Sequence, residues 1–170
     1  LASQLTKPKD AERLLAELRR KLADTPLVLE TYHGPGRSGK VRQSDEERTR
    51  VLSDFMAKLV SVMVATCAFG LGINKRGIKQ IIHVGLPHNF LDGYVQEIGR
   101  GGRGGVPARC TLLASSADVA VLDRGAVPAS RHTGTRHADR MRDFLFGDGC
   151  RWAFLREAFG ELTPWMSADG

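Results

Sequence analysis

The sequence predicts an α/β fold built on a mostly parallel sheet. Short stretches that are apolar throughout alternate along the chain with stretches in which apolar residues recur at helical spacing. Strands that are apolar on both sides are typical of parallel sheets whose two faces are covered by helices. The chain has 170 residues, 42% of them hydrophobic, which is enough to bury a core without disulfides or metals. We therefore expect one α/β domain followed by a short helical extension.

The first elements have clear local signals. Residues 9–23 carry leucines at helical spacing and end in the cations Arg19, Arg20 and Lys21, which suit the C-terminus of a helix. An apolar, β-branched run at residues 27–32 predicts a buried strand.

A second helix and three more strands follow. Ser44, with Glu47 three residues later, is a capping box, which predicts a helix start at this point. The remaining strands are expected at residues 60–66, 80–84 and 109–114. The remaining helices are expected at residues 89–98 with Asn89 as cap, after Ser116, at residues 137–146 and at residues 150–159.

The domain boundaries follow from where this alternation stops. Periodicity is lost after residue 124 in a stretch rich in Gly, Pro, Ser, Thr and His. We expect the α/β domain at residues 1–124, a linker at residues 125–136 and the helical extension at residues 137–170. The chain begins with Leu1 rather than Met, and we expect it to be a piece of a longer protein.

Charge favours a polyanionic partner. The chain has 25 Lys and Arg against 19 Asp and Glu, a net charge of +6, and the whole excess lies in residues 1–105. The longest stretch without charge, residues 59–73, is shorter than the roughly 20 apolar residues of a membrane-spanning helix. The three cysteines are far apart in the sequence, which predicts buried thiols in a reducing compartment.

The sharpest local feature is a loop at residues 99–105, in which five of seven residues are glycine and the others are Arg100 and Arg103. Arginines flanked by glycine can approach a phosphate chain closely and donate planar, permanently charged forks. Such arginines can raise the rate of phosphoryl transfer by about 10³–10⁵. Two other interpretations remain: tandem Arg-Gly-Gly triplets of a flexible nucleic-acid-binding tail, or a flexible turn.

A strand that runs into a glycine-containing loop forms the second candidate site. Ligands of open α/β sheets bind at the carboxyl ends of the strands. This places a set of residues where a sugar or phosphate could bind: Thr66, Gly70, Gly72, Asn74 and Lys75.

Two further patterns are weaker. Residues 34–40 match the spacing of a phosphate-binding P-loop, but Val41 replaces the hydroxyl that would bind Mg²⁺, and the next helix begins only near Ser44. His132, His137 and Cys150 could be imagined as metal ligands, but they are not clustered in the sequence. We therefore predict neither a working P-loop nor a metal site.

Taken together, these segments resemble the second RecA-like domain of RecQ-type DNA helicases, in helicase superfamily 2. Motif V in the form Thr-x-Ala-Phe-Gly-x-Gly-Ile-Asn-Lys, and a Gln-Glu opening to motif VI, are more similar to RecQ than to DEAD-box RNA helicases. The similar segments are residues 6–21 (motif IV), Tyr32-His33-Gly34, the helix at residues 44–55, VATCAFGLGINK at residues 64–75 (motif V), IIHVGLPHN at residues 81–89 and YVQEIGRGGRGG at residues 94–105 (motif VI).

The resemblance implies a role for each matching residue. Arg100 and Arg103 would be arginine fingers that reach ATP, with its Mg²⁺, held mainly by a partner lobe. Gln96, Gly99, Asn74 and Gly72 would lie at the nucleotide, and Thr66, His33 and Lys75 at single-stranded DNA. The implied activity is that of an ATP-dependent 3′→5′ DNA helicase that works in DNA repair or recombination, in the nucleus, or in the nucleoid or cytoplasm of a prokaryote.

The sequence also departs from the family pattern. Gly101 and Gly104 stand where motif VI usually has Ala and Asp, and residues 35–43 resemble an insertion. Cys150 resembles the first ligand of the family's zinc-binding subdomain, of which residues 137–170 would be a truncated start, but no further cysteine follows, so we expect no stable zinc binding.

The first RecA-like lobe, with its P-loop and DExH pair, is not in this sequence. We therefore expect the isolated chain to be inactive. The alternative interpretation is a noncatalytic nucleic-acid-binding module or a decayed helicase remnant.

Overall fold

The computed structural model of the chain describes residues 2–3, 8–34, 43–66, 69, 73–87, 89–123 and 134–161. All but Gly34 of the P-loop-like segment at residues 34–40 lies outside these residues, as do Val41, Gly70, Gly72 and His132. The elements in order are β1 (Ala2–Ser3), α1 (Pro8–Lys21), β2 (Leu29–Tyr32), α2 (Asp45–Met56), β3 (Val62–Ala65), β4 (Gln80–Val84), α3 (Phe90–Ile98), β5 (Arg109–Leu113), α4 (Ser116–Asp123), α5 (Gly134–Phe146) and α6 (Arg151–Ala158).

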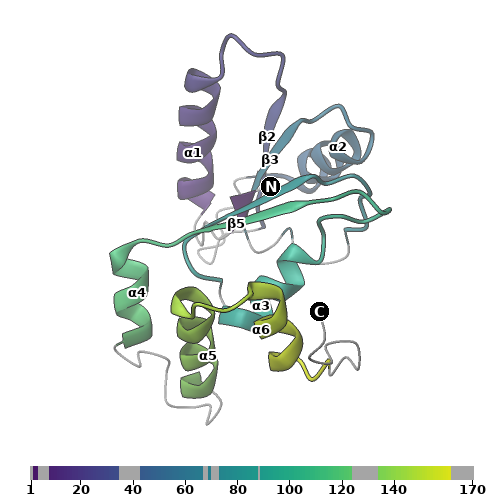
Figure 1. Cartoon of the computed structure of the whole chain (residues 1–170). Coiled ribbons are helices and arrows are strands. Elements are labelled where there is room, and N and C mark those ends of the chain that lie inside the picture. The colour runs from purple at the N-terminus through teal and green to yellow at the C-terminus, as the bar shows by residue number, and fades with distance from the viewer. Residues whose placement is uncertain are drawn as a thin grey trace.

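The five strands form one sheet in the order β2-β3-β1-β4-β5 (Figure 1). Every pairing is parallel; Thr31 of β2 lies opposite Val64 of β3, and His83 of β4 lies opposite Leu112 of β5. The predicted α/β class with a parallel sheet is confirmed.

Strand β1 was not predicted. It pairs with both β3 and β4, so it occupies the centre of the sheet although its described part is only Ala2–Ser3. Two residues are too few to show a strand pattern. The structure therefore adds a strand to the prediction rather than moving one.

Helices cover both faces of the sheet, as the apolar strands predict. Alternate residues of β3 point to opposite faces, so Val64 packs with α1, whereas Met63 packs with α2. Figure 1 shows α1 and α2 on opposite sides of the β2–β3 end of the sheet. The α2 side contributes Phe55, which lies edge-on to Phe69 with ring centroids 5.6 Å apart.

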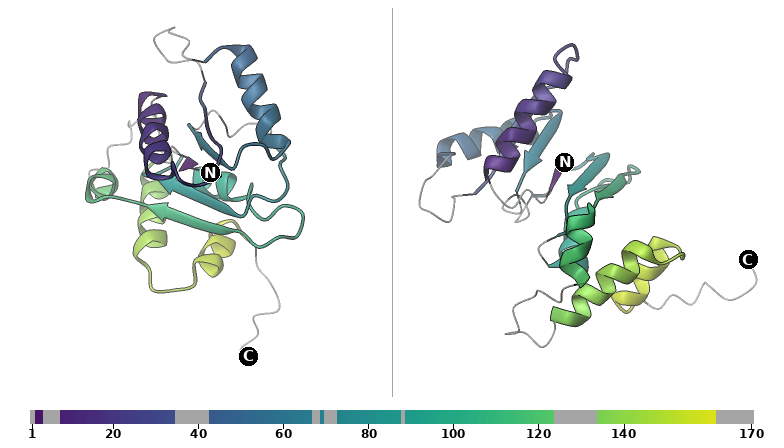
Figure 2. Two further views of the ribbon diagram at one scale, coloured as in Figure 1. Left: turned by 90° about the horizontal axis from the view of Figure 1, so that it is seen from above. Right: turned by 90° about the vertical axis from the view of Figure 1, so that its left-hand side faces the viewer.

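The C-terminal helices share a hydrophobic core with the α/β domain. One cluster joins α3, α4, α5 and α6, and Leu112 of β5 packs against it. Tyr94 of α3 contacts Phe144 of α5, with ring centroids 5.1 Å apart. Figure 2 shows these helices at the opposite end of the molecule from α1 and α2. Helix α5 begins at Gly134, three residues before the predicted helix start at His137.

The helix caps agree with the predictions in part. The Ser44 side chain accepts a hydrogen bond from the Glu47 amide at 3.1 Å, which confirms Ser44 as the N-cap of α2 and the predicted helix start. Asn89 occupies the cap position of α3 without a side-chain cap bond. The start of α4 is held by Ser115 rather than Ser116, because the Ser115 hydroxyl and Asp118 bond reciprocally. In the described part of the chain, no helix is long and apolar enough to cross a membrane.

Candidate functional site

The loop after α3 presents the two arginines, and its turns depend on glycine. Gly102 has φ +71°, a conformation that L side chains rarely adopt, and its amide donates to the Ile78 carbonyl at 3.1 Å. At position 101, a Cβ would come within 3.0 Å of the Ala108 Cβ. The loop therefore passes so close to the segment before β5 that a side chain at position 101 would need Ala108 to shift by a few tenths of an ångström.

Arg100 and Arg103 converge on one backbone carbonyl. Each donates from its Nη1 atom to the Ile73 oxygen at 3.2 Å. Arg103 also donates to the Asn74 side-chain oxygen at 2.9 Å and, from Nε, to the Gly99 carbonyl at 3.0 Å. Three predicted site residues of one loop, Gly99, Arg100 and Arg103, thus meet the distant predicted residue Asn74.

The two arginines differ in exposure. Arg100 is only 7% exposed, and burial lowers its pKa, as does the charge of Arg103, while Glu97 raises it. Its Nε is buried and has no hydrogen-bond partner among the described residues. A buried cation with an unused donor is costly.

A buried polar group that the sequence patterns did not single out lies beneath the loop. His83 on β4 places Nδ1 3.1 Å from a carboxylate oxygen of Glu97 on α3. The Tyr94 ring lies 5.0 Å from the His83 ring. Glu97 sits inside motif VI, but nothing local in the sequence pairs it with a residue 14 positions earlier.

A second group of predicted site residues lies at the carboxyl ends of β2 and β3. The Thr66 amide donates to the Tyr32 carbonyl at 3.2 Å, and both Thr66 and His33 are buried. His33 places Nε2 3.6 Å from a Glu12 carboxylate oxygen, whereas its Nδ1 has no hydrogen-bond partner in the described structure.

Gln43 holds this group together and was not foreseen. Its side-chain oxygen accepts from the His33 amide at 3.2 Å, and its side-chain nitrogen donates to the Thr31 carbonyl at 3.0 Å. The sequence did not indicate this role, because Gln43 lies in a stretch that resembles an insertion. The Gln43 amide satisfies the buried N–H of His33, just past the end of β2, and the carbonyl of Thr31 within the strand.

Lys75, a predicted DNA-binding residue, lies against the C-terminus of α2. Its ammonium donates to the carbonyl of Phe55 and, at 3.3 Å, to that of Met56, and it lies 4.7 Å from the centroid of the Phe55 ring. Burial lowers the pKa of Lys75, as does the neighbouring charge of Lys58. The side chain therefore stabilises the C-terminus of α2, where a cation complements the helix dipole.

The remaining predictions concern Gln96 and a metal site. Gln96 is exposed on α3. Within the residues that the structure describes, no three His, Cys, Asp or Glu side chains lie together in a way that could hold a metal ion. The arginine loop supplies donors for phosphate, not carboxylates for a cation.

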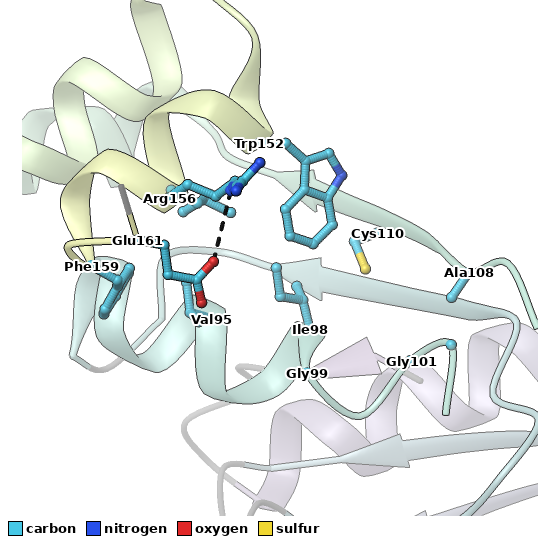
Figure 3. A pocket seen from close by; sticks show the side chains of 12 residues that line it. Val95, Ile98, Gly99, Gly101, Ala108, Cys110, Trp152, Arg156, Phe159 and Glu161 are labelled. Atoms are coloured by element: carbon cyan, nitrogen blue, oxygen red, sulfur yellow. Dashed lines mark ion pairs between the residues drawn. The ribbon is translucent and has the colours of Figure 1, made fainter. Parts of the chain in front are cut away.

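A groove of about 320 Å³ lies behind the arginine loop, between α3 and α6 (Figure 3). Its walls are mostly apolar and include Ile98, Cys110 and the exposed Trp152. Arg156 and Glu161 form an ion pair of 3.7 Å at its rim.

Comparison with known proteins gives consistent matches. A family described as "Helicase conserved C-terminal domain" matches residues 10–105. The ATP-dependent DNA helicase RecQ of Bacillus subtilis is 34% identical over 92% of this chain and 25% of its own length. The ATP-dependent DNA helicase Q4 of Mus musculus is 41% identical over 51% of this chain and 6% of its own.

A solved structure of Mycobacterium smegmatis helicase Lhr, bound to single-stranded DNA and AMP-PNP, matches the fold. The TM-score is 0.57 at 22% identity, over 83% of this chain and 17% of that one. The chain thus spans about a quarter or less of the length of these relatives.

Proposed function

The chain belongs to the helicase conserved C-terminal domain family and is of the RecQ type, and from this we propose that it is the second motor lobe of an ATP-dependent 3′→5′ DNA helicase. In this proposal a first RecA-like lobe holds ATP and Mg²⁺. This chain then closes over the nucleotide with its arginine loop.

The observation that carries the proposal is the convergence of Arg100 and Arg103 on the Ile73 carbonyl. A neutral carbonyl is a weak partner for two guanidinium groups, whose preferred partners are carboxylates and phosphates. Charge that develops on a transferred phosphoryl group would be a stronger acceptor. Arg103, which is partly exposed and aligned by Asn74 and Gly99, is the better placed of the two to reach across a domain interface.

DNA contact is proposed for the carboxyl ends of β2 and β3. His33 retains an unused Nδ1, and Thr66 lies beside it at the end of the neighbouring strand. Both side chains are almost wholly buried, so contact would be made by single atoms. Lys75 is left out of the proposed contact set because its ammonium is bound to α2.

The arginine loop leads into β5 and the proposed DNA contacts follow β2 and β3 of the same sheet, which suggests how hydrolysis moves DNA. Closure of the lobes would bring the arginine loop to the phosphates, and opening after hydrolysis would withdraw it. The DNA-contacting strand ends would move with it. Contacts of this kind to the DNA backbone depend strongly on salt and little on base sequence.

The decisive variant is Arg103→Ala in the full-length protein. We expect DNA-stimulated ATP hydrolysis to fall by about 10³-fold or more, because the charge on the transferred phosphoryl group loses its stabilising partner. DNA affinity, measured by fluorescence anisotropy, should stay close to that of the parent protein.

The matched control is Arg109→Ala, which removes an exposed arginine at the start of β5. Hydrolysis should be unchanged in this variant. If Arg103→Ala instead weakens DNA binding and leaves hydrolysis intact, the chain is a noncatalytic nucleic-acid-binding module.

A further inference from the structure

A buried acid–base pair joins the sheet to the helix that carries the arginines. His83 in β4 is fully buried, and Glu97 in the last turn of α3 is 9% exposed. Their atoms Nδ1 and Oε2 are 3.1 Å apart, a hydrogen-bond distance at which the imidazole donates and the carboxylate accepts. This contact fixes the proton of a neutral His83 on Nδ1.

Packing alone does not require this pair. Helix α3 already buries Leu91, Tyr94 and Ile98, and Tyr94 also contacts Phe144 of α5. Burying ionisable groups is expensive, and an apolar pair of similar size often stabilises a protein equally well. The pair adds something that apolar packing does not, a directed polar link between β4 and the last turn of α3.

The pair is directly connected to Arg100. The Arg100 amide donates to the Glu97 carbonyl at 3.2 Å, so the turn that orients the carboxylate also orients the arginine. Burial and the charge of Arg103 lower the pKa of Arg100, and the nearby Glu97 carboxylate acts against this shift. The strand that carries His83 also lies close to the arginine loop. A Cβ placed on Gly101 would lie 3.2 Å from the side chain of Ile81, which is two residues before His83.

We propose that His83 and Glu97 are a positioning pair for the arginine loop: His83 holds the Glu97 carboxylate, and Glu97 holds the last turn of α3 so that Arg100 faces the nucleotide. This inference rests on the proposed function. Neither residue touches the phosphates. The pair acts through Arg100, by limiting the directions that the guanidinium can take before ATP arrives.

The test uses two pairs of variants in the full-length protein. His83→Asn keeps a side-chain N–H near the position of Nδ1, whereas His83→Leu removes it. Glu97→Gln keeps an acceptor oxygen without the charge, whereas Glu97→Ala removes both. Glu17→Gln is the control, because it removes a carboxylate that forms an ion pair of 3.7 Å with Arg20 on the exposed face of α1.

We expect kcat for ATP hydrolysis to fall by about 10²-fold in His83→Leu and Glu97→Ala, the effect of a misplaced catalytic group. The KM for ATP and the Kd for DNA should stay unchanged. His83→Asn should restore most of the activity, and Glu97→Gln should lie between Glu97→Ala and the parent protein.

Three outcomes would overturn the inference. One is unchanged hydrolysis in His83→Leu and Glu97→Ala while Arg103→Ala abolishes it, which leaves the proposed function standing. Another is a parallel loss of kcat, ATP affinity, DNA affinity and Tm, which indicates a purely structural pair. The third is failure of His83→Asn to restore activity although the variant melts like the parent. If Arg103→Ala itself has no effect on hydrolysis, the proposed function fails first.

Discussion

At the scale of single residues, the Lys75 side chain binds a different part of the molecule from the one that its sequence neighbours predict. It ends a glycine-containing loop after a buried strand, a position typical of phosphate contacts. In the structure its four-carbon stem reaches back to the last turn of α2, where the ammonium meets two carbonyls and an aromatic ring. The C-terminal carbonyls of a helix lack partners within the helix, and a lysine can supply them from a distance.

Lys75→Met should therefore destabilise the domain. The shape of the stem is kept, but the Phe55 and Met56 carbonyls lose a charged donor, which should cost about 1–2 kcal/mol of unfolding free energy. Chemical denaturation of the isolated chain measures this loss. DNA affinity of the full-length protein should not change.

Lys79→Met is the matched control, since Lys79 is an exposed lysine just before β4. It should leave the unfolding free energy within the error of the measurement. If the Lys75→Met variant is as stable as the parent but binds DNA more weakly, Lys75 contacts DNA and does not stabilise α2.

At the scale of elements, the N-terminus of α6 changes the chemistry of a cysteine. Cys150 is exposed at the cap position, and the backbone N–H groups of Ala153 and Trp152 lower the pKa of its thiol. Cys110 in β5 is half-buried, and burial raises the pKa of its thiol. The two cysteines should therefore differ in reactivity.

We expect iodoacetamide to alkylate Cys150 faster than Cys110 in the folded chain near pH 7. The thiolate is the reactive form, and a lowered pKa increases its population at that pH. Peptide mass spectrometry at successive times gives the two rates. In denaturant the rates should become equal, and a folded chain in which Cys110 reacts as fast as Cys150 would contradict the assignment.

Elements also show which local signals are reliable. Most strands and helices lie within two or three residues of their predicted positions, because the alternation of buried and exposed residues is recorded in the sequence itself. The exact residue that caps a helix is harder to predict. At the start of α4, Ser115 rather than Ser116 binds Asp118, because adjacent serines have the same side chain and only the backbone direction distinguishes them. The central strand β1 had no signal to find.

At the scale of the whole molecule, the helical extension is part of the domain core. Residues 137–170 are predicted as the truncated start of a helical subdomain, and the described helices α5 and α6 bury Met141, Phe144 and Leu155 in one cluster with α3. Since α3 ends in the arginine loop, the extension supports the same helix that carries the candidate site.

Phe144→Ala should destabilise the domain as a whole. Phe144 is 5% exposed and lies between the rings of Tyr94 and Phe154, so its removal should cost about 3–5 kcal/mol. Thermal unfolding followed by circular dichroism should show one transition at a lower Tm. Phe146→Ala, at an exposed phenylalanine of the same helix, is the control. Two separate transitions in the parent chain would show that the extension unfolds by itself.

The sequence by itself determined the α/β class, the order of most elements, the family and the residues worth testing. Local patterns suffice for these properties, because they depend on the spacing of apolar residues and on short motifs. Only the tertiary structure decided which of those residues meet. It brought Arg100 and Arg103 to Ile73, and Arg103 also to Asn74. It paired His83 with Glu97 and turned Lys75 to α2. Contacts between segments distant in the sequence depend on how the sheet and helices pack, and no local pattern records that packing.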